Sequence, residues 1–312
     1  IAAGSKWATA EAGPWRLSLD HISYLPAMAH LHKRSIRERL YRAYVDIAGT
    51  ANAPVIAETL SVRQQQARIL GFATHAECSL ERKMAPSVAA VDGLHERMLE
   101  KAMPMARREL SQLTAFAASH GFDGGHLEHW DVPYWRARLS AATLHLEEES
   151  LRTYFVLPRV IISLGRLCER LFGVALVEAG GADAPPVWHA DVRYFHVYDC
   201  TSGDRLGAFY FDPYARAGKR PGAWMDVCAA RSRVQGHVPV AYLVCSISPP
   251  AMGQPPLMSF EEVRTLFHEM GHVLQHVLTT VDYKPAAGTD NIEWDAVELP
   301  SQFMENFCYD PR

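Results

Sequence analysis

The stretch that decides the fold runs from residue 259 to residue 278 and reads SFEEVRTLFHEMGHVLQHVL. Ser259 is followed three residues later by Glu262, and this capping box predicts that a helix begins here. The apolar residues that follow cover a broad part of the helix surface, so we expect the helix to be mostly buried. They are Val263, Leu266, Phe267, Met270, Val273, Leu274, Val277 and Leu278.

Two histidines in this helix, His268 and His272, are four residues apart. Residues at i and i+4 lie on one helix face, so both imidazoles can reach one metal ion. Glu269 lies about 100° further round the helix, where it is well placed to accept a proton from water. The pattern therefore predicts a site for one zinc ion with Glu269 as general base. The alternative is a buried helix whose histidines are satisfied by hydrogen bonds within the core.

Gly271 supports the metal hypothesis. A glycine inside a helix costs about 1 kcal/mol relative to alanine, so its presence indicates that another backbone or a ligand comes close. His276 lies one turn beyond His272. We interpret it as a residue that supports the site or lines a channel, rather than as a further ligand.

A catalytic zinc ion takes three protein ligands and keeps one position open. The segment 292–307 offers four carboxylates for the third position, and their spacing alone does not choose among them. A second carboxylate is expected to orient a zinc-bound histidine, and Asp295 or Glu305 could serve. Pro300 predicts a distorted helix here or one that begins late. The four carboxylates are Glu293, Asp295, Glu298 and Glu305.

The rest of the chain predicts a mostly α-helical protein with a small β-sheet beside the His268–His272 helix. Apolar periodicity predicts a helical lobe over residues 1–180 and a catalytic lobe over residues 181–312. The expected helices cover residues 26–48, 52–70, 86–120 (kinked or divided at Pro104) and 156–172. The expected strands are a hairpin of 191–198 with 206–211, and 238–247, which either forms a sheet edge for a peptide or lies inside the sheet.

Composition narrows the class of partner. The 312 residues carry a net charge of -4, which gives no reason to expect nucleic acid or an anionic membrane. The six cysteines are widely spaced, which favours reduced thiols and an intracellular compartment. The chain begins at Ile1 and stops at Arg312, soon after the candidate ligands, so we expect it to be part of a longer protein.

Two segments resemble the thimet oligopeptidase and oligopeptidase A family of zinc metallopeptidases, and the oligopeptidase A branch most. They are FHEMGH at 267–272 and EWDAVELPSQFMEN at 293–306. The similarity continues through GAFYFD at 207–212, VRYF at 192–195, YRAY at 41–44 and LGF at 70–72. It therefore covers most of the chain.

The resemblance implies that Glu298 is the third zinc ligand and that Glu269 is the general base. It implies a two-lobed, zincin-like fold with a channel that admits short peptides of roughly 6 to 20 residues. We expect a monomer in the cytoplasm, mitochondrion or chloroplast. The family places substrate-binding tyrosine and histidine residues downstream of the third ligand, beyond Arg312. The alternative is therefore a catalytically incomplete fragment that binds zinc and peptide.

Overall fold

The computed structural model describes residues 2–3, 15–144, 148–250 and 255–310. The chain divides into two compact units, residues 1–147 and residues 148–312. This division falls earlier than the boundary near residue 180 suggested by the sequence. The reason is that α8 (Leu157–Phe172) and β3 (Val174–Glu178) belong to the core and the sheet of the second unit. About half of the chain is helical, and the main sheet is small, mixed and five-stranded.

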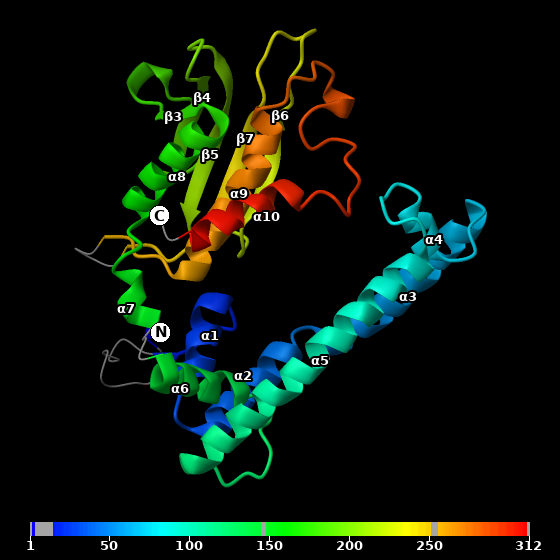
Figure 1. Ribbon diagram of the computed structural model, residues 1–312, viewed down its shortest axis with the longest axis vertical. Coiled ribbons are helices and arrows are strands. Elements are labelled where there is room, and N and C mark those ends of the chain that lie inside the picture. The colour runs from blue at the N-terminus through cyan, green and yellow to red at the C-terminus, as the bar shows by residue number, and fades with distance from the viewer. Residues whose placement is uncertain (1, 4–14, 145–147, 251–254, 311–312) are drawn as a thin grey trace. The chain divides into compact units, whose positions relative to one another are not determined.

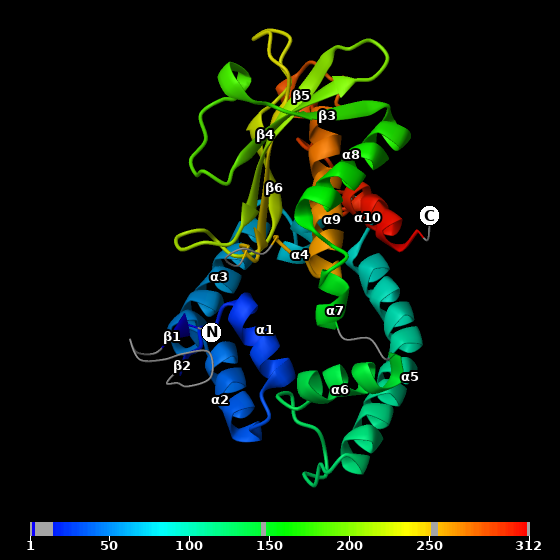
Figure 2. The same ribbon diagram turned by 90° about the vertical axis from the view of Figure 1, so that its left-hand side faces the viewer.

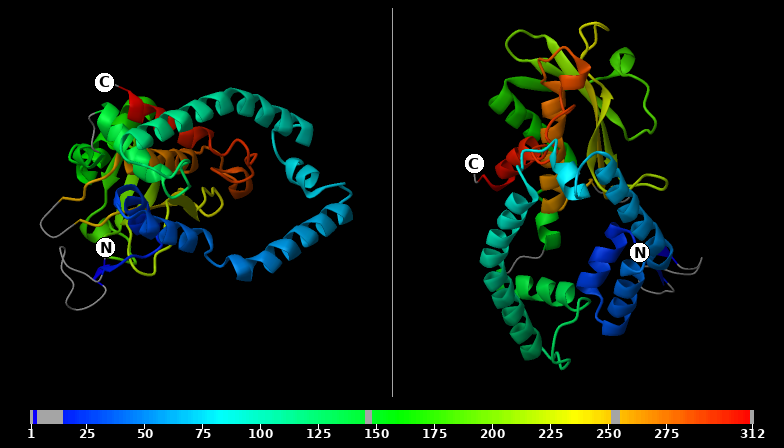
Figure 3. Two further views of the ribbon diagram at one scale, coloured as in Figure 1. Left: turned by 90° about the horizontal axis from the view of Figure 1, so that it is seen from below. Right: turned by 90° about the vertical axis from the view of Figure 1, so that its right-hand side faces the viewer.

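The first unit is built from helices. Figure 3 shows α3 and α5 as two long, separated helices that are connected at one end through α4. One helix had been expected over residues 26–48, but the backbone is extended at Leu31 and Lys33, so two helices form. Pro104 does not divide α5, which bends along its length (Figure 3). The elements are β1 (Ala2–Ala3), β2 (Trp15–Arg16), α1 (His21–His30), α2 (Arg34–Val45), α3 (Gly49–Ile69), α4 (His75–Leu80), α5 (Val88–Ser119) and α6 (Val132–Leu144).

The second unit contains the main sheet, whose strand order is β3-β4-β5-β7-β6. The expected hairpin is confirmed, because β4 and β5 pair antiparallel. The strand expected over 238–247 is β7, and it lies inside the sheet between β5 and β6. The edge beside it is therefore β6, which the sequence did not predict. The remaining strands are β4 (Arg193–Asp199), β5 (Arg205–Tyr214), β6 (Trp224–Ala229) and β7 (Val240–Ile247).

Helices α8 and α9 cover one face of this sheet (Figures 1 and 2). Strand residues Phe209, Phe211 and Leu243 pack there against Leu164 and Leu266, all nearly inaccessible to water. The helical elements of this unit are α7 (Glu148–Arg152), η1 (Gly181–Asp183), α9 (Phe260–Val277), η2 (Lys284–Ala286), α10 (Leu299–Glu305) and η3 (Asn306–Tyr309). Within the described ranges, no helix is both long and apolar enough to cross a membrane.

Helix α9 begins as the sequence predicts. The Ser259 hydroxyl accepts the amide of Glu262, and the Glu262 carboxylate accepts the amide of Ser259, which completes the capping box. Ten of its eighteen residues are buried. Helix α10 packs across α9 (Figure 1), so residues about 30 positions apart in the chain meet at one place.

Candidate metal site

Two histidines on α9, His268 and His272, form one side of the site. The ring centroids of His268 and His272 are 5.1 Å apart, as expected for side chains one helical turn apart. Burial lowers the pKa of His272, which favours the neutral imidazole that a metal ion requires. The first part of the predicted ligand set therefore lies on one helix face.

Glu298 places a carboxylate oxygen opposite both rings. Its Oε2 lies 3.2 Å from Nε2 of His268 and 3.1 Å from Nε2 of His272. The three ligand atoms all lie within 4.8 Å of one another. Bonds of 2.0–2.2 Å in a tetrahedral zinc site separate ligand atoms by about 3.3–3.6 Å, so the two distances to Glu298 are close to those expected around a zinc ion.

The local backbone explains how Glu298 reaches α9. Glu298 occupies the cap position of α10, which begins at Leu299, so the predicted late start of this helix is confirmed. The Ser301 hydroxyl contacts both Oε2 and the backbone oxygen of Glu298, each at 2.9 Å. The close approach predicted at Gly271 is also confirmed, because the α10 backbone at Pro300 and Ser301 lies directly against it.

Of the two carboxylates considered for orienting a histidine, the structure places Glu305 against His268. The distance from Glu305 Oε1 to His268 Nδ1 is 2.6 Å, so Nδ1–H donates and Nε2 keeps its lone pair for a metal ion. Asp295 lies in the exposed segment before α10. His276 is buried elsewhere on α9, and its Nε2–H donates to the backbone oxygen of Ala229 at 3.0 Å.

Glu269 lies on another face of α9, turned towards β6. Its side chain is buried, and burial raises its pKa to about 7, although the charge of His268 and the amide of Met225 act in the opposite direction. A carboxyl group with this pKa can both accept and return a proton near neutral pH. The amide contact from Met225 was not predicted, because β6 was not recognised in the sequence.

Two basic residues that follow β5 are held by a buried carboxylate. Arg216 and Lys219 both donate to the buried Asp212 carboxylate, at 2.6 and 2.9 Å. Lys219 also donates to the backbone oxygens of Tyr214 and Cys245. The signal for this cluster was the aspartate that precedes them in the same segment.

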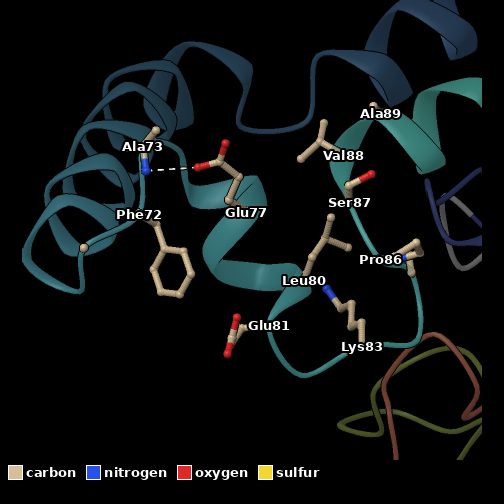
Figure 4. Close-up of a pocket in the computed structure, with 12 residues that line it drawn as sticks. Phe72, Ala73, Glu77, Leu80, Glu81, Lys83, Pro86, Ser87, Val88 and Ala89 are labelled. Atoms are coloured by element: carbon tan, nitrogen blue, oxygen red, sulfur yellow. Dashed lines mark hydrogen bonds between the residues drawn. The ribbon is translucent and has the colours of Figure 1, made fainter.

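A separate pocket of about 700 Å³ lies beside α4 in the first unit. Figure 4 shows Glu77 of α4 accepting the backbone amide of Ala73. None of the residues proposed to bind metal or act as base lines it.

The group of two histidines and one glutamate, with a buried carboxylate beside it, resembles the donor set of catalytic zinc sites in metallopeptidases. The model for Peptidase family M3 matches residues 27–312, and the chain belongs to this family. This confirms the resemblance to the thimet oligopeptidase and oligopeptidase A peptidases.

Named relatives agree. The chain is 44% identical to "Probable cytosolic oligopeptidase A" of Arabidopsis thaliana, over 99% of this chain and 45% of that protein. It is 44% identical to "Organellar oligopeptidase A, chloroplastic/mitochondrial" of the same plant, over 99% of this chain and 40% of that protein. It is 40% identical to "Oligopeptidase A" of Escherichia coli, over 95% of this chain and 44% of that protein. The chain thus spans less than half the length of these relatives.

Proposed function

We propose that this chain carries the catalytic centre of a zinc-dependent endopeptidase that hydrolyses internal bonds of short peptides. The observation that carries the proposal is the convergence of His268, His272 and Glu298 on one point, with the buried Glu269 beside them. Family membership supports the same reading, because the relatives are named oligopeptidases.

In the proposed reaction His268, His272 and Glu298 would hold one zinc ion, which would supply a Lewis acid and lower the pKa of water towards neutrality. Glu269 accepts a proton from the attacking water and then gives it to the amine of the leaving peptide. Glu305 holds the ring of His268 in the orientation that directs Nε2 to the ion.

We place the peptide along β6. An extended peptide can add a strand to a sheet edge, and β6 is paired on one side with β7 while Met225 within it contacts Glu269. A peptide in this position would pass close to the general base. The restriction to short peptides, and the channel between two lobes that would impose it, remain proposals that rest on the family.

The relatives' names also bear on location. One plant relative is named cytosolic and the other organellar, and we propose that this protein works in one of these compartments. We further propose that it acts as a monomer on peptides, without nucleic acid or membrane partners.

The test is mass-spectrometric detection of the cleavage of a peptide of about ten residues, with and without a chelator. The zinc content of the same sample is measured in parallel. Cleavage that the chelator stops and added zinc restores is the expected result. A folded sample that binds one zinc ion without cleaving would favour the second function, a zinc- and peptide-binding chain. A folded sample that binds no zinc would contradict both.

A further inference from the structure

His276 is a buried histidine that the proposed reaction does not use. Its side chain is 1% exposed, and its Nε2–H donates to the backbone oxygen of Ala229 at 3.0 Å. Among the described residues its Nδ1 has no hydrogen-bond partner. Gly288 closes this edge of the ring, because a Cβ atom built on Gly288 would lie 2.5 Å from Nδ1. The imidazole is thus held in one orientation, with the proton on Nε2.

His276 and Glu269 share one face of α9. They are seven positions apart, which is about two helical turns and about 10.5 Å along the axis. Both face the backbone of β6: the Met225 amide lies near enough to Glu269 to lower its pKa, and His276 donates to the last residue of the strand. These two strand residues are about 13 Å apart in an extended chain. Helix α9 therefore faces the edge strand β6 at two points.

The contact from His276 lies where the pairing of β6 with the sheet is interrupted. The pairing of β6 with β7 shifts register between Val227 and Ala229, so Cys228 is an extra residue in the edge strand. A bulge interrupts the hydrogen-bond ladder and leaves a strand end less constrained. The bond from His276 reaches the strand immediately after this interruption.

We propose that His276 is a positioning residue that fixes the register of β6 along α9 and so keeps the Met225 amide beside the Glu269 carboxylate. The part of the proposal that concerns the register of β6 depends only on the hydrogen bond from His276 to Ala229 and on the bulge beside it. The consequence for hydrolysis rests on the proposed function, because it requires Glu269 to act as the base and β6 to receive the peptide.

The experiment compares His276→Leu, which removes the donor, with His276→Gln, whose side-chain amide can place an N–H near the position of Nε2. Hydrogen exchange of the segment 223–230 is measured without metal or substrate, with β4 and β5 as the folded reference. Loss of one buried hydrogen bond costs about 1 kcal/mol or more, so exchange in His276→Leu should be about tenfold faster. In His276→Gln it should return to within about threefold of the unsubstituted protein.

Unchanged exchange in His276→Leu, or equally fast exchange in both variants, would overturn the proposal. Zinc affinity should stay within about threefold in both variants, since His276 is not a ligand. A joint loss of zinc affinity would show instead that His276 supports the metal site directly. Failure of the unsubstituted protein to bind zinc or cleave peptide counts against the proposed function alone, because the exchange measurement depends on neither.

Discussion

A Cβ atom on Gly271 would lie 2.5 Å from the backbone oxygen of Pro300. The same atom would lie 2.5 Å from the Cα of Ser301, so both obstacles are backbone that cannot rotate away. Gly271 therefore sets how closely α10 approaches α9. This approach is what brings Glu298, at the start of α10, within reach of the two histidines.

Gly271→Ala should lower both stability and zinc affinity. Alanine favours the helix by about 1 kcal/mol, but overpacking against rigid backbone costs about 1–3 kcal/mol, and moving α10 displaces Glu298. The free energy of unfolding and the zinc dissociation constant are the measurements. Gly165→Ala is the matched control, because Gly165 lies inside α8 and, apart from the neighbouring helix backbone, no atom of the described residues comes within 4 Å of its Cβ position. That variant should be as stable as the unsubstituted protein or more so. Equal behaviour of the two variants would contradict the role given to Gly271.

Local rules predicted helix α9 well. The capping box, the buried apolar face, the i, i+4 histidines and the close approach at Gly271 all depend on residues a few positions apart, where helix geometry fixes the outcome. The late start of α10 follows in the same way from Pro300, which lacks the N–H that a helix interior needs.

The edge strand β6 could not be predicted in this way. Its sequence, Trp224 to Ala229, follows a turn and includes an acidic residue and a bulge, so it lacks a clear alternation of apolar and polar side chains. Its place in the sheet depends on the parallel pairing of β5 with β7, a contact between distant segments that no local pattern determines. For the same reason spacing alone did not choose among the carboxylates of segment 292–307, whose distances to the histidines depend on how α10 packs.

Glu305→Gln should weaken zinc binding about 10- to 100-fold, because a carboxylate that accepts Nδ1–H of a ligating histidine raises the basicity of the other nitrogen. Competition with a chromogenic chelator measures this affinity. Glu293→Gln is the control, since Glu293 is an exposed carboxylate in the segment just before α10. Equal losses in the two variants would indicate a general electrostatic effect rather than the 2.6 Å contact with His268.

Glu269→Gln should reduce kcat/KM for peptide hydrolysis by about 10² to 10⁴, the usual contribution of a general acid–base group. Zinc affinity should be retained, because the three ligand atoms come from other residues. Glu261→Gln, an exposed change on the first turn of the same helix, should leave hydrolysis unchanged. Full activity in Glu269→Gln would remove this residue from the mechanism.

The Asp212 cluster should make the second unit sensitive to acid. Burial raises the pKa of Asp212, but hydrogen bonds from Arg216, Lys219 and Trp188 outweigh it and lower the pKa from 3.8 to about 2. A folded-state pKa below the unfolded value stabilises the protein above the unfolded pKa, and this stabilisation is lost as pH falls through the folded pKa. The loss should amount to about 2 kcal/mol between roughly pH 4.5 and pH 2.

Denaturant unfolding at several pH values, in the unsubstituted protein and in Asp212→Asn, tests this expectation. Asp212→Asn should be less stable near neutral pH, because it leaves the buried Lys219 ammonium without its carboxylate partner. The gap between the two proteins should narrow by about 2 kcal/mol as the pH falls towards 2, since only one of them can lose the Asp212 charge. Asp204→Asn, a change at an exposed turn position, should leave the pH dependence of the unsubstituted protein intact. A gap that stays constant across this range would mean that Asp212 does not stabilise the fold through its charge. The contacts of Lys219 with backbone oxygens would then have to hold the loop on their own.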